Sequence, residues 1–281
     1  MYVTLYVVII LTALTCAPVR KKQQEMTDMD LGLNGKVAIV VGGSSNIGRA
    51  TGIRLAEEGA KVVIAYSSND VKAGEALEAI KAAGGEAVAY KGDMTVEAHV
   101  NGLCKRAIET FGRIDILIYS AMLWPTNMVT EIPLDEWKRT LDVNLTGVFL
   151  TNRWVTKYWL ENGMPGKILN FSSQAAFKGS TTFHAHYAAA KAGVVAFTVS
   201  LAREVGNKGI AVNAIAPGMA LVPGPDAIID EEAAKYYKTR IPIGRIGSPF
   251  EVADLAVFMV SERNSYMIGA TVDVSGGMLM R

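Results

Sequence analysis

Residues 36–66 read KVAIVVGGSSNIGRATGIRLAEEGAKVVIAY, and this stretch sets the pattern for the whole chain. The apolar run KVAIVVG predicts a strand that is buried on both faces. A glycine-rich loop follows, and a helix is expected over residues 47–58, with Gly59 at its end. Residues 61–66, KVVIAY, predict a second strand. Because no hairpin signal separates the two strands, we expect them to be parallel and joined by the helix.

The same alternation continues to the C-terminus. Further strands are expected over residues 86–93, 114–120, 167–173, 210–218 and 271–274. Helices are expected over residues 71–83, 96–111, 134–160, 185–205 and from a Ser-Pro-Phe-Glu capping motif at 248–251 to about residue 260. The pattern predicts an α/β fold: a doubly wound parallel sheet (Rossmann fold) of about seven strands with helices on both faces. Ligands of such a sheet bind beyond the carboxyl ends of the strands.

The composition indicates one large folded domain, expected over residues 31–281. The chain has 281 residues, of which 50% are hydrophobic, and this is enough for a large core. The 28 basic and 27 acidic residues nearly balance, so nucleic acid is not an expected partner. Cys16 and Cys104 lie far apart, and the histidines lack the spacing of metal ligands. Neither a disulfide framework nor a metal site is therefore predicted.

Residues 1–30 are expected to form a separate N-terminal apolar arm. Residues 2–19 carry no charge, and basic residues follow at 20–22. The arm is an upstream extension ahead of a start at Met26 or Met29, a membrane anchor, or a signal peptide. Because the basic residues follow the apolar run, the signal peptide is the least favoured of the three. The extension is preferred, so a cytoplasmic location is expected, with membrane contact only if the arm is an anchor.

The glycine loop after the first strand has the chemistry of a phosphate site. Gly42 and Gly48 allow the backbone to approach a pyrophosphate, and the N-terminus of the next helix favours negative charge. Such a loop can also be a simple turn. Its place after the first buried strand favours the phosphate site.

Tyr187 and Lys191 stand four residues apart in an alanine-rich helix and therefore share one face of it. We expect the ammonium to lower the pKa of the phenol, while Ser173, at the end of the preceding strand, can hydrogen-bond the same substrate oxygen. A Tyr and a Lys at this spacing also occur by chance on solvated helices. Other motifs in the chain are needed to distinguish a catalytic pair from a chance pair.

From residue 31 to 280, the chain resembles the short-chain dehydrogenases/reductases. The loop at Gly42–Gly48 is similar to their TGxxxGxG loop, and YAAAK at 187–191 matches their YxxxK pair. Asn144 in LDVNLTG and Ser173 in NFSSQ match the other members of the family's catalytic tetrad. The resemblance implies a nicotinamide-dependent oxidoreductase that acts on a carbonyl or secondary alcohol.

The resemblance also implies a role for each member of the tetrad. Tyr187 exchanges a proton with the substrate oxygen, and Ser173 binds and polarises that oxygen. Lys191 lowers the pKa of the tyrosine and holds the nicotinamide ribose. Asn144 anchors a water molecule of the proton relay. A homotetramer assembled through the long helices that carry Asn144 and Tyr187 is likewise implied.

Several positions depart from the family pattern. Asn46 replaces a loop glycine, but Asn tolerates the left-handed backbone that glycine supplies. The family's NNAG after the fourth strand is YSAM at 119–122, which puts Met122 beside the expected cofactor site. Near the C-terminus, Ser275 takes the place of an acidic residue. No departure removes a member of the tetrad.

The end of the second strand favours NADP(H) over NAD(H). It carries Tyr66, Ser67, Ser68 and Asn69, with no carboxylate to repel a 2′-phosphate. Asp93 resembles a family aspartate that holds the adenine amino group, and a simple strand-end cap is the alternative. The expected cofactor-binding residues are Gly42, Ser44, Ser45, Asn46, Ile47, Gly48, Tyr66, Ser67, Ser68, Asp93, Met94, Ser120, Ala121, Tyr187, Lys191, Pro217 and Gly218.

The substrate is expected to be a small, apolar carbonyl compound or alcohol, with cyclic ones included. A lid over residues 219–247 is predicted to cover it, and His186 is expected to frame the same side of the site. The candidate contact residues are Trp124, Gln174, Phe183, His184 and Met219.

Two rival functions stay open. The IPIGRIG segment at 241–247 also resembles reductases of 3-oxoacyl thioesters on acyl carrier protein. The YSAM segment at 119–122 instead favours a nucleotide-binding sensor or scaffold without turnover, against which the intact tetrad argues.

Overall fold

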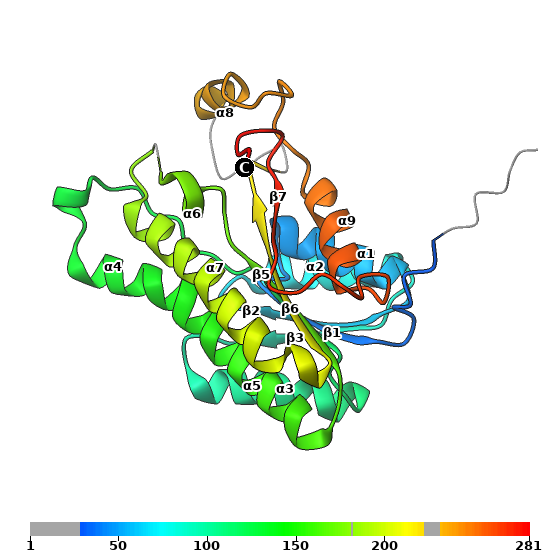
Figure 1. The fold of residues 1–281 in the computed structure, drawn as a ribbon. Helices are drawn as coiled ribbons and strands as arrows, with labels where there is room; N and C mark the ends of the chain where they lie inside the picture. Colours follow the sequence, from blue (N-terminus) through cyan, green and yellow to red (C-terminus); the bar gives the residue numbers. More distant parts are fainter. Residues whose placement is uncertain (1–28, 181, 222–230) are drawn as a thin grey trace, which may run out of the picture. The chain divides into compact units, whose positions relative to one another are not determined.

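Seven parallel strands form one sheet in the computed structural model, which describes residues 29–180, 182–221 and 231–281. The spatial order is β3-β2-β1-β4-β5-β6-β7 (Figure 1). Strands β1 to β3 are added towards one edge of the sheet and strands β4 to β7 towards the other, so the strand order reverses between β1 and β4. The strands are β1 Val37–Val41, β2 Lys61–Tyr66, β3 Ala87–Lys91, β4 Ile116–Tyr119, β5 Gly166–Phe171, β6 Ile210–Pro217 and β7 Thr271–Val274. In register, Val37 pairs with Lys61 on one side, and Ala38 pairs with Ile116 on the other. The expected doubly wound parallel sheet is confirmed.

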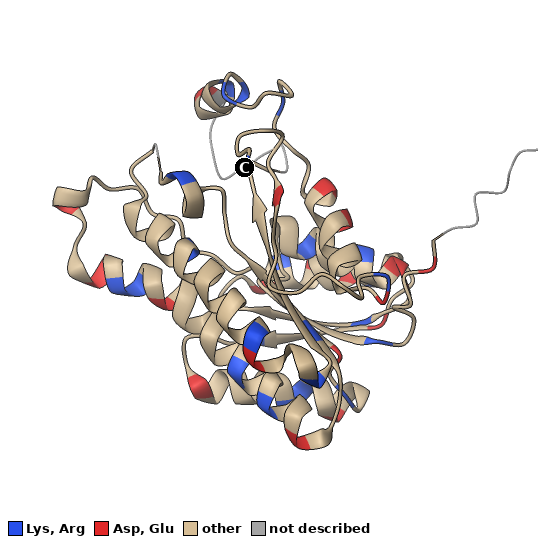
Figure 2. Ribbon diagram, in the orientation of Figure 1, with Lys and Arg blue, Asp and Glu red and all other residues tan. Residues whose placement is uncertain are grey.

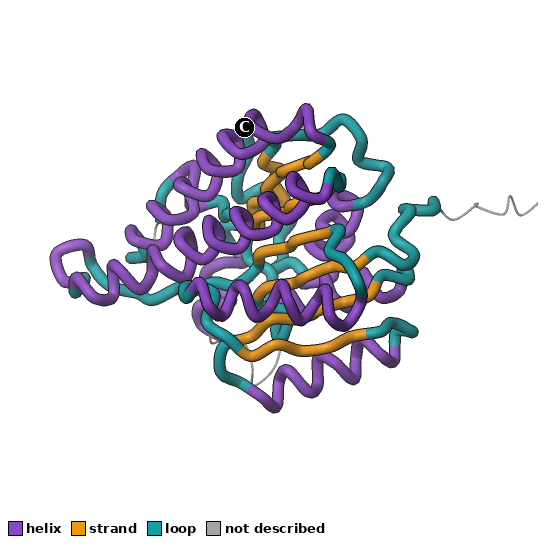
Figure 3. Tube along the Cα trace, turned by 90° about the horizontal axis from the view of Figure 1, so that it is seen from below, coloured by secondary structure: helices purple, strands orange, loops and turns teal. Residues whose placement is uncertain are grey.

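Helices cover both faces of the sheet (Figure 3). Side chains of β1 alternate between them: Ile39 and Val41 join the core under α3, α5 and α7, whereas Ala38 and Val40 join the core under α1, α2 and α9. The helices are α1 Asn46–Glu57, α2 Asp70–Ala82, α3 Glu97–Phe111, α4 Leu134–Leu141, α5 Gly147–Asn162, α6 Ala175–Lys178, α7 Ala185–Val205, α8 Glu231–Lys238 and α9 Pro249–Val260. Short 3-10 turns lie at Val129–Glu131 and Gly206–Lys208.

The expected helix over 134–160 differs most from the structure. It consists of α4 and α5 joined by a π-helical segment, Asp142–Thr146, in which the backbone N–H of Gly147 bonds to the carbonyl of Asp142. Two helices also lie where only loops were expected, α6 after β5 and α8 within the predicted lid. The capping box of α9 is confirmed. The backbone N–H of Phe250 donates to the Ser248 hydroxyl at 3.3 Å, and the backbone N–H of Ser248 donates to Oε2 of Glu251 at 2.8 Å.

Residues Leu31–Arg281 form one compact unit. The expectations for the arm, apart from Met29 and Asp30, fall on residues outside the described part of the chain, and so does the lid between 222 and 230. Within the described residues, no helix is long and apolar enough to cross a membrane. Basic and acidic side chains are interspersed along the helices that cover the sheet (Figure 2), and some pair between helices, as Arg153 of α5 does with Glu97 of α3.

Candidate active site

A cavity of about 1120 Å³ lies at the carboxyl edge of the sheet. Its walls come from the loops after β1, β2, β4, β5 and β6, and from residues of α6, α7 and α8. This is the edge where parallel strands of reversed order open a crevice for a ligand.

The loop between β1 and α1 forms a cradle, and the positions of Gly42 and Gly48 require glycine. Gly42 has φ +81°, and a Cβ there would lie 2.6 Å from the backbone nitrogen of Ala121. At Gly48 a Cβ would lie 2.1 Å from the carbonyl oxygen of Gly42. Asn46, which replaces a glycine, has φ +44°, the left-handed region that Asn tolerates. Ser44, Ser45, Asn46 and Ile47 line the cavity, so an anion can meet the first turn of α1.

The end of β2 holds more positive charge than the sequence indicated. Tyr66 and Ser67 line the cavity, but Ser68 does not. Arg49 and Lys72 line it as well, and Arg49 lies 3.6 Å from Glu75, another wall residue. Arg49 and Lys72 stand in the first turns of α1 and α2, which both face the carboxyl edge. Their positions near the N-termini of the helices that follow β1 and β2 could have identified them from the sequence.

Asp93 uses both carboxylate oxygens within the protein. Oδ1 accepts from the backbone and hydroxyl of Thr95 at 2.9 and 2.8 Å, and Oδ2 pairs with Arg139 at 2.8 Å. Burial raises its pKa, but these hydrogen bonds and the charge of Arg139 outweigh burial and hold the pKa below its usual value. The side chain thus acts as a strand-end cap, although it lines the cavity with Met94.

Ser120 and Ala121 also line the cavity, next to the glycine loop. The Ser120 hydroxyl donates to the carbonyl of Val41 at 2.8 Å, which ties β4 to β1. Tyr119 is buried, and its hydroxyl bonds to the carbonyl of Val143 at 2.9 Å. Met122 is 45% exposed at the cavity wall. The YSAM segment is therefore accommodated with its bulky ring turned into the core.

Ser173, Tyr187 and Lys191 meet at the bottom of the cavity. Lys191 is almost fully buried; its Nζ donates to the carbonyl of Phe171 at 2.7 Å and lies 5.6 Å from the centre of the Tyr187 ring. A hydrogen bond joins Tyr187 and Ser173. The i, i+4 spacing on α7 and the end of β5 thus place a phenol, a hydroxyl and an amine around one space.

The electrostatics of this group differ from the expectation that Lys191 lowers the phenol's pKa. Burial raises the pKa of Tyr187 to about 12, and the bond to Ser173 opposes the rise only in part. Burial also lowers the pKa of Lys191 to about 7. Both charged forms lose hydration here, and no charged group among the described residues contributes to either shift. At pH 7 the phenol is therefore protonated, and about half of the amine carries a charge.

Asn144 lies behind the cavity wall rather than on it. It is fully buried in the π-helical segment, and its Nδ2 donates to the carbonyls of Leu123 and Thr140 at 2.8 and 2.9 Å. Its Oδ1 accepts from the backbone N–H of Leu123 at 3.4 Å. The side chain expected in a proton relay thus holds the segment that follows β4.

Four of the five expected substrate residues line the cavity: Trp124, Gln174, His184 and Met219. Phe183 does not. Its side chain is 58% exposed, and its φ of +61° turns it outward while His184 turns inward. His186 is also absent from the wall, because it is buried and its Nε2 lies 3.1 Å from Oε1 of Glu136.

Part of the far wall comes from the predicted lid. Tyr237 and Arg240, in and just after α8, lie within residues 219–247 and line the cavity. Lys178 of α6 and Met278 near the C-terminus also line it, and neither was among the expected site residues. The ammonium of Lys178 donates to the carbonyl of Met278 at 3.0 Å. Pro217 and Gly218 form the wall at the end of β6, and a Cβ on Gly218 would lie 2.7 Å from the Cα of Ser275. The C-terminal residues therefore help to close the site.

Comparison with known proteins gives matches over nearly the whole described unit. Residues 41–279 match the family model described as enoyl-(acyl carrier protein) reductase. The chain is 36% identical to a 3-oxoacyl-[acyl-carrier-protein] reductase of Synechocystis over 88% of this chain and 98% of that one. It is 39% identical to 3beta-hydroxysteroid dehydrogenase 1 of Eggerthella lenta, over 88% and 95% of the two chains. A crystal structure of a short chain dehydrogenase from Bacillus anthracis superposes with TM-score 0.79 and 33% identity, over 89% and 99%.

Proposed function

Since the chain belongs to the short-chain dehydrogenase/reductase family, whose members transfer hydride between a nicotinamide cofactor and a carbonyl or alcohol carbon, we propose that Tyr187 is its proton donor and acceptor. The observation that carries this role is the buried group of Tyr187, Ser173 and Lys191 at the bottom of the cavity. We assign the chain to the NAD(P)-dependent oxidoreductases of CH–OH groups.

The residues at the sheet edge fit a nicotinamide dinucleotide. The cradle at Gly42 and Gly48 leaves no room for a Cβ, and the first turn of α1 suits the pyrophosphate. Pro217 and Gly218 would flank the nicotinamide, and Lys191 would hold ribose hydroxyls. When bound, the cofactor supplies hydride to the carbonyl carbon or takes it from the alcohol carbon.

In the direction of reduction, the Tyr187 hydroxyl gives its proton to the substrate oxygen as negative charge develops there. A pKa near 12 keeps this proton in place at neutral pH until that charge appears. Ser173 hydrogen-bonds the same oxygen and orients the carbonyl. Lys191, held by the carbonyl of Phe171, would donate hydrogen bonds to the ribose hydroxyls, and its protonated form stabilises the phenolate that is left when Tyr187 has given up its proton. Asn144 keeps the wall at Leu123 in place.

Replacement of Tyr187 by Phe tests this role. Purified enzyme would be offered a panel of ketones and secondary alcohols while nicotinamide absorbance is followed. We expect kcat to fall by about 10²–10⁴-fold in Tyr187→Phe, because the general acid is lost. Binding of reduced cofactor, followed by its fluorescence, should be retained. Undiminished turnover in Tyr187→Phe would refute the assignment, and cofactor binding by the wild type without turnover on a broad panel would indicate a sensor.

The proposed cofactor is NADP(H). The residues that follow β2, Ser67, Ser68 and Asn69, include no carboxylate, and Arg49 and Lys72 line that part of the cavity together with Glu75. We expect kcat/KM to be higher with NADPH than with NADH, and Lys72→Gln to reduce it for NADPH far more than for NADH. Equal losses with both cofactors would contradict a contact between Lys72 and the 2′-phosphate.

A second candidate is the reduction of 3-oxoacyl thioesters. The family model is described by an acyl-carrier activity, and the Synechocystis relative carries the 3-oxoacyl reductase name. Assays with acetoacetyl thioesters and with small cyclic ketones would separate the candidates. A kcat/KM at least tenfold higher for the thioesters would favour this second activity.

We further propose a cytoplasmic homotetramer assembled through α4, α5 and α7. Phe149 of α5 is 41% exposed and packs edge-to-face on Phe197 of α7, so these helices offer an apolar outer face. Size-exclusion chromatography with light scattering would test the assembly, and a monomer at micromolar concentration would contradict it. A chain that starts at Met26 and stays active would show that catalysis does not need the arm.

A further inference from the structure

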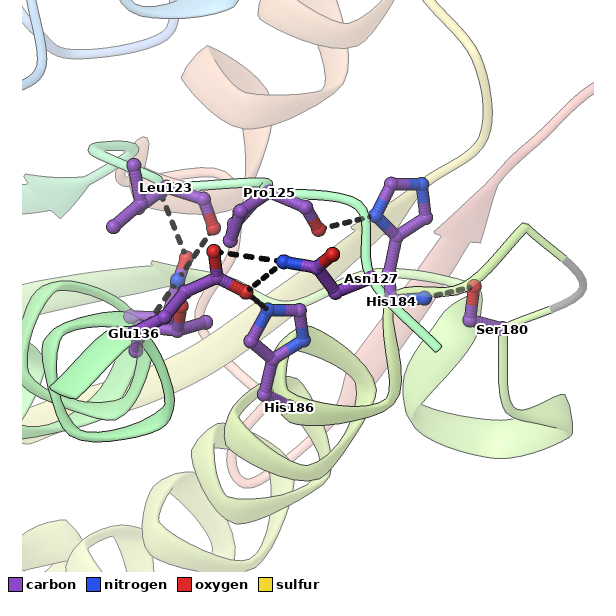
Figure 4. Close-up of polar contacts among 9 residues, drawn as sticks. Leu123, Pro125, Asn127, Glu136, Ser180, His184 and His186 are labelled. Carbon is purple, nitrogen blue, oxygen red and sulfur yellow. Dashed lines mark hydrogen bonds and ion pairs between the residues drawn. The ribbon is translucent and has the colours of Figure 1, made fainter. Parts of the chain in front are cut away.

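Residues 123–127, of which Leu123 and Trp124 line the cavity, are held by polar groups outside the segment (Figure 4). Asn144 bonds both the N–H and the carbonyl of Leu123. The carbonyl of Pro125 lies 2.7 Å from Nδ1 of His184, and the N–H of Asn127 donates to the carbonyl of Phe183 at 2.9 Å. We call residues 123–127 the clamped segment. Its contacts define the chemistry of His184.

The contact with Pro125 fixes which ring nitrogen of His184 carries the proton. A carbonyl oxygen only accepts hydrogen bonds, so Nδ1 must be the donor. Burial lowers the pKa of His184, and the neighbouring His186 lowers it further, against the favourable bond to Pro125. The ring is therefore neutral at pH 7 and has a single N–H, which is committed to Pro125. The second nitrogen, Nε2, keeps a lone pair and can only accept.

Nε2 is unmatched by a donor in the described part of the chain. The polar contacts of His184 there are those of Nδ1 with Pro125, of its backbone N–H with the hydroxyl of Ser180, and of its carbonyl with the N–H of Ala188. In Figure 4 the Nε2 edge of the ring faces away from Pro125 and from the cluster of Asn127, Glu136 and His186. Glu136, the nearby carboxylate, is occupied by Asn127 and His186 and makes no contact with His184.

The ring cannot readily turn to find another partner. The indole of Trp124 stacks on it with centroids 4.2 Å apart and planes at 26°, and only 3% of His184 is exposed. Both rings line the cavity. On the same wall, Oε1 of Gln174 is buried and has no hydrogen-bond partner among the described residues, whereas Nε2 of His184 is not fully enclosed by protein. Buried acceptors are normally satisfied, so the Gln174 oxygen beside the open Nε2 matches this wall to a ligand that brings a donor.

We propose that His184 is a specificity-determining residue whose Nε2 accepts a hydrogen bond from a second hydroxyl group of the substrate. The substrates are then hydroxyketones and the corresponding diols, rather than purely apolar ketones. The clamped segment fixes the direction of the acceptor through Pro125 and Trp124. This inference rests on the proposed function, because it concerns the same cavity and the same reaction.

Two substitutions separate the acceptor from the rest of the ring. In His184→Asn, the amide nitrogen can still donate to Pro125, as Nδ1 does, but nothing replaces Nε2. In His184→Gln, the longer side chain can bring its carbonyl oxygen to the place of Nε2. The probes are the 2-, 3- and 4-hydroxycyclohexanones, each compared with cyclohexanone. The quantity measured is the ratio of kcat/KM for the hydroxyketone to that for the parent ketone.

We expect the wild type to prefer at least one hydroxyketone by about tenfold, equivalent to about 1.4 kcal/mol. That ratio should fall to about one in His184→Asn and be largely kept in His184→Gln. Reduced-cofactor fluorescence and thermal melting would verify that each variant is folded and loaded.

Three results would overturn the inference alone: no preference for any hydroxyketone in the wild type, an unchanged ratio in His184→Asn, or equal loss of the ratio in both variants, which would assign the effect to the stacked ring. Absence of turnover on all four ketones by wild-type enzyme that binds cofactor is a different outcome. It would count against the proposed function and remove this inference with it.

Discussion

Replacing Lys191 by Met should change how the stability of the enzyme depends on pH. The side chain is almost fully buried, and burial lowers its pKa from the ordinary 10.5 to about 7. At pH 9 the folded protein therefore holds this amine neutral, whereas the unfolded chain holds it protonated. Met has nearly the same length as Lys and carries no charge. The variant therefore removes this difference in protonation and changes the packing little.

The sign follows from proton binding. Between pH 7 and pH 9 the unfolded state of the wild type binds more protons at Lys191 than the folded state, so its free energy of unfolding rises with pH. With folded and unfolded pKa values of about 7 and 10.5, the rise over this interval is about 2 kcal/mol. Tyr187 does not interfere, because its pKa is raised to about 12 and it stays protonated in both states below pH 9.

The measurement is urea unfolding of wild type and Lys191→Met without cofactor, at pH 7 and pH 9 and at one protein concentration. The wild type should gain about 2 kcal/mol relative to the variant as the pH rises. Taking the difference between the two proteins cancels all other titrating groups. Parallel pH profiles, or a relative loss by the wild type, would show that Lys191 is not held neutral by burial and would refute the reasoning.

Three further substitutions, one of them with a matched control, probe other parts of the structure. Gly48→Ala puts a Cβ 2.1 Å from the Gly42 carbonyl and should lower stability by about 1–3 kcal/mol and weaken cofactor binding, measured by urea unfolding and fluorescence. Gly74→Ala, with nothing within 4 Å on α2, is its control and should gain about 0.5–1 kcal/mol; an equal loss in both would refute the steric account. Ser248→Ala removes the cap of α9 and should cost about 1 kcal/mol in the same assay, so an unchanged midpoint would contradict it. Asn144→Ala frees Leu123 and should raise KM for substrate; a fall in kcat alone would instead favour the relay role.

The sheet and the phosphate cradle could be predicted from the sequence because their signals are local. Buried parallel strands need unbroken apolar runs, as at Val37–Val41. A backbone at φ +81° with no room for a Cβ needs glycine at Gly42. Asn46 was predicted to adopt a left-handed conformation for the same local reason, and it does so.

Other features depend on contacts that no local pattern encodes. The π-helical segment at 142–146 adds one residue to a turn, and the residue types along the segment do not signal this insertion. Phe183 was placed in the cavity by its neighbourhood in sequence, but its positive φ turns it outward. The pKa values of Tyr187 and Lys191 depend on burial from all sides, which spacing along α7 cannot show. Arg49 and Lys72 line the cavity because of the way α1 and α2 are rotated about their axes, and this rotation is set by packing.

The clamped segment, which we propose to set substrate selectivity, lies apart from the residues proposed to transfer the proton. Residues 123–127 pair with no strand, and the groups that fix them belong to Asn144, Phe183 and His184, outside the segment. The side chain of Trp124 can therefore change while the backbone bonds at Leu123, Pro125 and Asn127 persist. We therefore expect substitutions at Trp124 to alter the substrate range while the proposed proton-transfer groups, after β5 and on α7, stay in place. Directed evolution of this protein would start most economically at that position.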